Sequence, residues 1–384
     1  MTDESRIQFH PLEILHEDDE YVIGRKQIGS FISLPEIGIK AINLLDKGLS
    51  IKKVKNILEE EYAEEIEIEE FVETLIEVGF IKKVDNHFIQ TEHEEINAYF
   101  SQLKQEYAKI LFSRPAYCTY ATLIVTAMLL LVFHPEFFPS INDFMFTDSY
   151  TIVLLTTLVL GWIFIFKHEF FHLAAAKSLG LEAQFRISHR LYFIVAETDI
   201  TSVWTIPRKK RYRVYFAGII SDLLVISILI ILLWLSSGSD HLVMRLCRTI
   251  ILLQSISLVW QCLFFMQTDV YYILTNYLNC KNLFADTRGY LGNIVNKIWT
   301  IFPPYDLSAI PEREMRIVKI YSVFFVGGNC IAIGILFYYI IPRAVHTVFR
   351  ITENVNTSFD NMAFVGILCF NIILLIRSIR REVL

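Results

Sequence analysis

Hydrophobic and polar positions divide the chain into two parts near residue 115. Before this point apolar residues recur at short intervals among many charged ones, and after it they gather into long runs with few charges. Six of these runs predict membrane-spanning helices, at about residues 116–133, 150–176, 214–235, 244–266, 318–341 and 362–376. The pattern predicts a multi-pass α-helical membrane protein with a smaller domain in front of the first span.

The residues before the first span predict a soluble α+β domain over residues 1–95. Three strand-like runs come first, at residues 12–15, 20–25 and 29–33. Helical periodicity then favours three helices between Pro35 and Gly79, with Gly48 ending the first of them. A hairpin expected around Asp85 adds a β wing, so the predicted domain is winged-helix-like.

Composition supports this division of the chain. Hydrophobic residues make up 54% of it and the mean hydropathy is +0.43, which is too high for a soluble core alone. A polar stretch at residues 96–114 predicts a linker helix before the membrane domain of residues 115–384. The polar, acidic start predicts no cleavable signal peptide. The six cysteines lack the spacing of a metal site, and the acidic first domain gives no reason to expect nucleic acid.

Basic residues in the loops predict the orientation of the spans. Residues 134–149 and 236–243 contain no Lys or Arg, whereas residues 177–213 contain eight. Loops rich in these residues stay in the cytoplasm, so we expect a protein of the cell membrane with both termini cytoplasmic. The cluster from Arg208 to Arg213 is then the anchor of the third span, and Lys167 is expected to snorkel from the second span to the interface.

Two histidines and a glutamate lie near the inner end of the second span, in the order His168, Glu169, His172. Residues four apart share one face of a helix, so both imidazoles can bind one ion while Glu169 reaches a metal-bound water. This HExxH arrangement is typical of zinc metallopeptidases. Three ionisable groups in a span are costly without a partner, which favours one zinc ion over the alternative of polar side chains snorkelling to the interface.

A catalytic zinc ion usually has a third protein ligand and an open fourth position. Asp269 follows the inner end of the fourth span, at the level expected for the two histidines, and is the first candidate. Asp286 and Asp306 are weaker candidates because they lie farther along the cytoplasmic loop. Asp222, within the third span, is expected about three helical turns from any histidine, as a functional residue or one that pairs with another residue.

Over residues 150–290 the chain resembles the site-2 protease family of intramembrane zinc metalloproteases. The matching pieces are the motif His168-Glu169-Phe170-Phe171-His172, the Ala217-Gly218 pair that opens the next span, and Thr268-Asp269 followed by Tyr271 and Tyr272. The branch that it resembles most is associated with peptide-maturation and secretion clusters. Asn282 and Leu283 match the Asn-Leu pair of that branch.

This resemblance implies roles for individual residues. His168, His172 and Asp269 would bind the zinc ion, and Glu169 would be the general base. Val270 stands where the family usually has glycine, and its side chain is expected to narrow the turn beside the metal.

The first ninety residues resemble the PqqD-like peptide-recognition domain of peptide-modifying systems. The resemblance lies in the order of the strands, the LPEIG helix start, the short second helix and the LIEVGFIKK wing. It implies that the domain captures a leader peptide as an added strand. The alternative is a winged-helix module with another partner or a purely structural role.

Two further stretches have candidate roles in substrate binding. Residues 184–206 predict a hairpin at the membrane edge that turns near residues 197–199, where Phe193 and Val195 would hold an unwound substrate by strand addition. An ordinary cytoplasmic loop is the alternative. Asn329, beside Gly327 and Gly328 in the fifth span, is the candidate for stabilising negative charge on the scissile carbonyl, with helix packing as its alternative.

Together these patterns lead us to expect a membrane-embedded zinc metalloendopeptidase. It would cleave a precursor peptide or a membrane-bound precursor near the cytoplasmic face, in peptide maturation or secretion, with the first domain selecting the substrate. One alternative is a peptide-binding membrane receptor or export partner that does not cleave. Another is a regulatory intramembrane protease that acts on a signalling factor. All three functions involve the lipid bilayer and none involves nucleic acid.

Overall fold

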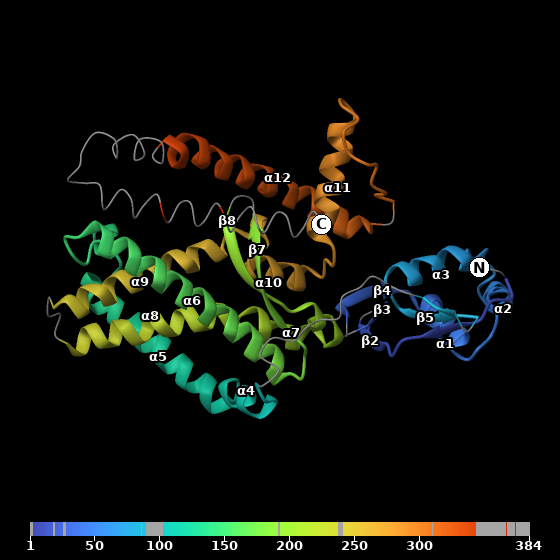
Figure 1. Cartoon of the computed structure of the whole chain (residues 1–384), viewed down its shortest axis with the longest axis horizontal. Helices are drawn as coiled ribbons and strands as arrows, with labels where there is room; N and C mark the ends of the chain where they lie inside the picture. Colours follow the sequence, from blue (N-terminus) through green and yellow to red (C-terminus); the bar gives the residue numbers. More distant parts are fainter. Residues whose placement is uncertain are drawn as a thin grey trace. The chain divides into compact units, whose positions relative to one another are not determined.

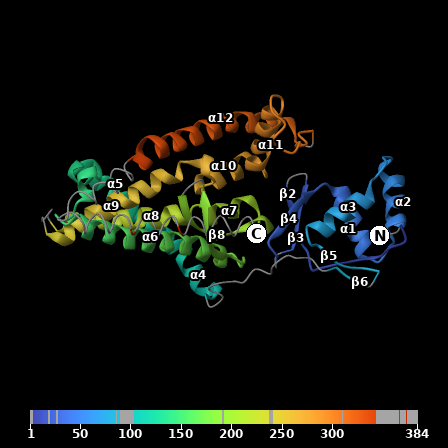
Figure 2. The ribbon, with the colours of Figure 1, turned by 45° about the horizontal axis from the view of Figure 1, so that its top comes forward.

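The computed structural model describes residues 3–17, 20–25, 28–85, 87–89, 103–190, 193–236, 241–308 and 310–342, together with positions 366 and 373. The chain divides into two compact units (Figure 1, Figure 2). The first contains Met1–Lys109, Leu173–Phe185 and Thr198–Val214, and the second contains Ile110–His172, Arg186–Glu197 and Tyr215–Leu384. Residues on both sides of the predicted hairpin therefore group with the N-terminal residues.

The N-terminal part of the first unit combines short strands with three helices. The strands are β1 (Ile7–Phe9), β2 (Glu13–Glu17), β3 (Glu20–Arg25), β4 (Ser30–Leu34), β5 (Ile81–Val84) and β6 (His87–Phe88). They form antiparallel sheets with the orders β1-β5-β6 and β2-β3-β4. The predicted strands and wing are present. β1 was not predicted, because three residues carry no period and its pairing with β5 joins distant parts of the sequence.

The three predicted helices are α1 (Glu36–Asp46), α2 (Ile51–Tyr62) and α3 (Ile68–Glu77). Apolar residues three and four positions apart put one face of each helix into a common core. The core includes Ile42, Leu45, Val54, Leu58, Val72 and Leu75. Gly48 and Gly79, with φ of 84° and 78°, follow α1 and α3 in the left-handed conformation, which confirms both as helix ends.

Five helices among the described residues are long and apolar enough to cross a membrane. They are α5 (Arg114–Phe133), α6 (Tyr150–Ser178), α8 (Ala217–Leu235), α9 (Leu242–Gln261) and α12 (Glu312–Ile335), which η6 (Leu336–Ile340) extends. Much of their apolar surface is exposed, for example 75% for Phe133 of α5 and 71% for Val323 of α12, as expected of helices that face lipid. The sixth predicted span, residues 362–376, falls outside the described residues apart from positions 366 and 373.

The linker before the first span differs from the predicted continuous helix. α4 (Gln105–Leu111) is short, and Ser113 then starts a new helix by accepting a hydrogen bond from the backbone N–H of Ala116 at 3.3 Å. Pro115 lies in the first turn of α5, where its missing N–H removes no helical bond. The span therefore begins at Arg114 instead of residue 116. Residues 96–102 lie outside the described residues.

α8 is the helix around which the second unit packs. It lies against α5 and α9, and the three helices are side by side in Figure 1. Ala127 of α5, Ile230 and Leu233 of α8, and Ile251 of α9 are buried where the helices meet. Two short helices, η2 (Pro135–Phe137) and η3 (Ile141–Phe144), follow α5.

The residues after α9 form a second packed group. η5 (Phe264–Met266), α10 (Asp269–Leu278) and α11 (Leu283–Asn296) lead back to α12. Tyr271, Leu283, Val318 and Tyr321 are buried together. The Tyr271 hydroxyl also accepts a hydrogen bond from the backbone N–H of Phe284 at 3.1 Å. Packing of this kind fixes the position of α10, whose first residue is Asp269.

The predicted hairpin is present, but its turn is not where the sequence suggested. β7 (Gln184–Arg190) and β8 (Phe193–Asp199) form a two-stranded sheet, so β8 runs through the residues expected to turn. The Asp199 carboxylate instead accepts a hydrogen bond from the backbone N–H of Thr201 at 3.0 Å. This hydrogen bond to the side chain of Asp199 ends β8 and starts η4 (Thr201–Thr205). Asp199 is a turn-forming residue, but it marks the end of the strand and not the turn of the hairpin, which is why the predicted position of the turn was wrong.

α7 (Arg208–Tyr215) carries the basic cluster, but one member is not a membrane anchor. Arg211 is 1% exposed, donates to the Glu17 carboxylate of β2 at 2.6 Å and lies over the ring of Trp204. Glu17 also accepts a hydrogen bond from the backbone N–H of Arg208 at 3.0 Å. The anchor prediction is wrong for Arg211, because this carboxylate takes the place of water and lipid headgroups as its partner.

Replacing Arg211 with alanine should loosen the first unit, because Glu17 would lose its charged partner while remaining largely buried. We expect a local loss of up to about 3 kcal/mol, at the low end for a broken buried pair because Glu17 keeps some exposure. Amide hydrogen exchange in Glu13–Glu17 and Thr201–Thr205 should become faster. Lys209→Ala removes an exposed neighbour of the same charge and is the control. Unchanged exchange in Arg211→Ala would contradict the prediction.

Candidate metal centre

α6 brings two imidazoles to one point. His168 and His172 are one helical turn apart and buried, and their Nε2 atoms are 3.2 Å apart. The ligand atoms of His168, Glu169 and His172 all lie within 4.8 Å of one another. The helical geometry predicted for the HExxH motif is therefore present.

Asp269 joins this group from a different element. Its Oδ2 atom lies 3.0 Å from Nε2 of His168 and 3.1 Å from Nε2 of His172. His168 and Asp269 are 101 positions apart in the sequence, so only the fold brings them together. The carboxylate predicted from the topology of the spans thus lies beside the two histidines.

These three atoms fit a zinc ion. They form a nearly equilateral triangle with edges of 3.0, 3.1 and 3.2 Å. A point at its centre would be about 1.8 Å from each atom, slightly less than the zinc bond length of about 2.0–2.2 Å. A zinc ion held by these three atoms would have three protein ligands, and zinc in catalytic sites takes water as the fourth. The Glu169 carboxylate lies within 4.8 Å of a nitrogen of each imidazole. We treat Asp269 as the third ligand because its Oδ2 lies within 3.1 Å of both Nε2 atoms.

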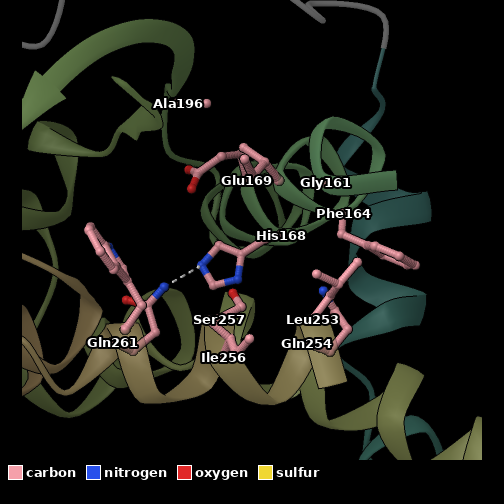
Figure 3. A pocket seen from close by; sticks show the side chains of 12 residues that line it. Gly161, Phe164, His168, Glu169, Ala196, Leu253, Gln254, Ile256, Ser257 and Gln261 are labelled. Atoms are coloured by element: carbon pink, nitrogen blue, oxygen red, sulfur yellow. Dashed lines mark hydrogen bonds between the residues drawn. The ribbon is translucent and has the colours of Figure 1, made fainter. Parts of the chain in front are cut away.

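Gln261 holds the start of α10 in place. Its Oε1 accepts a hydrogen bond from the backbone N–H of Asp269 at 3.1 Å, and its backbone carbonyl accepts one from the Thr268 hydroxyl at 2.6 Å. Its Nε2 lies 3.5 Å from Nε2 of His168, and Figure 3 shows the side chain directed toward that ring. These contacts tie the end of α9 to the carboxylate that α10 presents.

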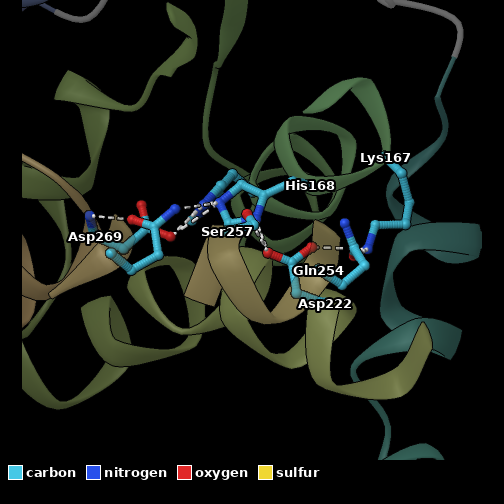
Figure 4. A network of polar contacts seen from close by, with 8 residues as sticks. Lys167, His168, Asp222, Gln254, Ser257 and Asp269 are labelled. Carbon is cyan, nitrogen blue, oxygen red and sulfur yellow. Dashed lines mark hydrogen bonds and ion pairs between the residues drawn. The ribbon is translucent and has the colours of Figure 1, made fainter. Parts of the chain in front are cut away.

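A second carboxylate lies behind His168 (Figure 4). Oδ2 of Asp222 is 2.8 Å from Nδ1 of His168, and its Oδ1 accepts a hydrogen bond from Nζ of Lys167 at 2.8 Å. Lys167 also donates to Oε1 of Gln254 at 3.1 Å, and the Ser257 hydroxyl donates to Asp222 at 3.3 Å. A proton on Nδ1 that is donated to Asp222 leaves Nε2 of His168 with its lone pair toward the metal position.

Two predictions about this network are wrong. Asp222 is not three helical turns from a histidine, because α8 begins at Ala217 and Asp222 is in its second turn, level with His168. Lys167 does not snorkel, since it is bonded to Asp222 and Gln254. Among apolar helices a carboxylate is the partner that a partly buried ammonium group needs.

The Asp269 carboxylate is ionised in this arrangement. Burial opposes its charge, but the imidazoles of His172 and His168 outweigh burial and hold the pKa of the carboxyl well below its ordinary value. A carboxylate binds metal in its ionised form. Asp269 is therefore ready to act as a ligand at neutral pH.

Gly218 lies directly against both imidazoles. A Cβ atom at this position would be 2.2 Å from Nε2 of His168 and 2.4 Å from Nε2 of His172. Non-bonded atoms do not approach this closely, so only glycine leaves room for the rings. The Ala217-Gly218 pair noted in the sequence therefore has a steric reason at the metal centre.

Val270 lies within a helix and not in the turn that precedes it. It is the second residue of α10, and the left-handed residue that precedes the helix is Gln267, with φ of 55°. β-branched side chains fit a helix, so position 270 does not need the conformational freedom of glycine. The expectation drawn from the family's glycine is wrong for this chain.

The other candidate ligands are occupied elsewhere. Asp286 accepts a hydrogen bond from the Tyr305 hydroxyl at 2.8 Å, and burial together with this bond raises the pKa of Tyr305 to about 12. Asp306 accepts hydrogen bonds from the backbone N–H and hydroxyl of Ser308, at 2.8 and 2.7 Å. Asn329 donates to the Phe325 carbonyl at 2.6 Å, within α12. Its role as a charge stabiliser stays a prediction.

A cavity of about 330 Å³ opens beside the centre (Figure 3). Residues of α6 and α9 line it, among them His168 and Glu169, and Ala196 of β8 also contributes. Phe193 and Val195 belong to the same strand as Ala196. Their contact with a substrate stays a prediction.

Sequence reasoning missed the polar residues of α9. Gln254, Ser257 and Gln261 are three and four positions apart, so they lie on one face of an otherwise apolar helix, and all three line the cavity. A polar stripe in a membrane span usually faces protein or a cavity. This periodicity is the signal that could have identified them.

Gly218→Ala should strongly weaken zinc binding without unfolding the protein. In the absence of metal the imidazoles can turn away from the added methyl group, but zinc-bound imidazoles cannot. We expect zinc affinity to fall about 100-fold or more, in the upper part of the range for disturbed ligand orientation. Gly327→Ala is the control, because a Cβ there meets nothing within 4 Å. Metal analysis of both purified variants checks this, and full zinc content in Gly218→Ala would contradict it.

Asp222→Asn should weaken zinc binding by about 10–100-fold, as expected for a residue that orients a ligand. The amide keeps the size of the side chain but loses the charge that holds both Lys167 and the tautomer of His168. Competition with a chelator of known affinity measures the change. Asp306→Asn removes a carboxylate that bonds to Ser308 and serves as the control. Equal zinc affinity in the two variants would leave Asp222 without a role at the metal.

Comparisons of this chain with protein-family models, with curated proteins and with solved structures find no match. Its function is therefore inferred from the chemistry of the site. That site contains two imidazoles, the Asp269 carboxylate and a nearby glutamate, and a cavity opens beside it.

Proposed function

We propose that this chain is a membrane-embedded zinc metalloendopeptidase. The observation that supports this most is the meeting of His168 Nε2, His172 Nε2 and Asp269 Oδ2 within 3.2 Å of one another. Three protein ligands with a free fourth position are typical of catalytic zinc, whereas structural sites usually have four. Glu169 lies next to these ligands, as a general base for a metal-bound water must.

A zinc ion held by these residues would polarise the scissile carbonyl and lower the pKa of a water molecule towards neutrality. Glu169 would take a proton from the attacking water and deliver it to the leaving amine. One water is consumed, and the peptide bond is replaced by a carboxylate and an amine. Asp222, itself held by Lys167, would keep Nε2 of His168 directed at the metal throughout.

The substrate would reach Glu169 as an extended segment. Backbone hydrogen bonds within a helix shield its peptide bonds, so a helical precursor must unwind before it is cut. The β7-β8 sheet has a residue, Ala196, in the lining of the cavity. A segment that adds to this sheet as a strand would lie beside Glu169, which supports the proposed role of the hairpin.

We assign substrate selection to the N-terminal domain. Its likeness to peptide-recognition domains supports capture of the leader of a precursor by strand addition. The protein would then act in peptide maturation or secretion, on a precursor peptide or a membrane protein. Cleavage would take place near the cytoplasmic face of the cell membrane, with both termini of the chain in the cytoplasm.

Glu169→Gln tests the proposed chemistry. Glutamine keeps the shape of the side chain but cannot accept the proton, so peptide hydrolysis should fall about 10²–10⁴-fold while zinc content stays the same. His172→Ala is the matched comparison and should lose both zinc and hydrolysis. The assay uses the purified full-length protein in liposomes, a decapeptide library and product analysis by mass spectrometry. Hydrolysis at the wild-type rate by Glu169→Gln would refute the proposal.

A further inference from the structure

The cavity beside the metal centre extends beyond the groups that the proposed chemistry uses. From His168 and Glu169 it follows α6 to Gly161, seven residues earlier. Seven residues are about two helical turns, or 10.5 Å along the axis, so Gly161 lies on the same face as His168. Figure 3 shows α9 on the opposite side of the cavity from these residues.

Gly161 leaves the far end of the cavity open. A Cβ atom at this position would meet nothing within 4 Å, so any larger side chain would extend into the free space. Glycine in the middle of a helix is less stable than alanine. The geometry supports one explanation for glycine at position 161: the absence of a side chain leaves room in the cavity for a bound group.

The size of the cavity limits what can occupy it. Binding pockets for small groups begin at about 300 Å³. The cavity has about 330 Å³ and therefore has room for one large side chain of a peptide.

The lining favours a peptide over a lipid chain. Near Gly161 the walls are apolar, with Phe164 and Ile165 on one side and Leu253 and Ile256 on the other. Polar side chains of α9 also line the cavity, and Glu169 closes it at the other end. An acyl chain has no group to bond with these, whereas a peptide has both an apolar side chain and amide groups.

We propose that this cavity is a specificity pocket for one large apolar side chain of the substrate, such as phenylalanine, leucine or methionine. The side chain belongs to a residue at a fixed position next to the scissile bond, and Gly161 sets the depth of the pocket. The inference rests on the proposed peptidase function and adds the substrate class to it.

Cleavage of a fully randomised decapeptide library by the zinc-loaded, full-length protein tests the pocket. At one position relative to the cut, the wild type should prefer large apolar residues over alanine and glycine by about tenfold or more. Gly161→Leu fills the pocket and should lower this ratio to about one. Gly334→Leu makes the same change at a helical glycine of α12 that also has nothing within 4 Å, and it should keep the wild-type preference.

A second measurement does not need turnover. Hydroxamates bind zinc, so the affinities of phenylacetohydroxamate and acetohydroxamate compare an aromatic arm with a methyl group at the same site. The wild type and Gly334→Leu should bind the aromatic compound about tenfold more tightly or better, and Gly161→Leu should bind both compounds equally.

The outcomes separate the pocket from the peptidase activity. Aromatic preference in the hydroxamate titration without cleavage of any peptide would support the pocket and refute the proposed function. Cleavage without a large apolar preference, or with a preference that Gly161→Leu leaves unchanged, would overturn the pocket and support the function. Equal binding of the two hydroxamates by the wild type would also overturn it. The proposed pocket would also be overturned if mass spectrometry found a lipid bound to the wild type and none bound to Gly161→Leu. That result would mean that the cavity holds an acyl chain.

Discussion

The need to neutralise charge among apolar helices is the constraint on which the rest of this structure depends. An ammonium and a carboxylate removed from water are stable only when they meet, and Lys167 and Asp222 meet at 2.8 Å. This contact requires α6 and α8 to approach closely, and Gly218 permits the approach because it has no side chain. The orientation of His168 follows, since the same aspartate takes the Nδ1 side of its ring.

The position of Asp269 depends on a second set of contacts. Gln261 binds its backbone, the left-handed Gln267 turns the chain toward it, and the buried Tyr271 fixes the helix that it begins. None of these residues is a metal ligand. They determine whether three ligand atoms stand at zinc-binding distances, so the precision of the site comes from its surroundings.

A feature could be predicted from the sequence when the residues that produce it are close together along the chain. Helices, strands and the HExxH face arise from local periodicity, so the N-terminal helices ending at Gly48 and Gly79 and the first five apolar helices were predictable. Asp269 could be placed because loop charges and span lengths bring two helix ends to one side. The partners of Asp222 and Arg211 could not be predicted, because they depend on how distant segments of the chain pack. Local rules placed Arg211 at the membrane interface and Asp222 within a span without identifying its partner, whereas the fold pairs both residues in buried sites.

The charges around His168 also determine which ions can be bound. Around a bound metal both imidazoles would be neutral, Lys167 would contribute one positive charge, and Asp222, Asp269 and Glu169 would contribute three negative ones. This group of side chains would then carry an excess of two negative charges. A divalent cation makes it neutral, a monovalent cation leaves it anionic, and a trivalent one makes it cationic among apolar helices, where excess charge is unfavourable. Electroneutrality would thus favour a divalent ion at this candidate site before ligand type or coordination geometry distinguishes one metal from another.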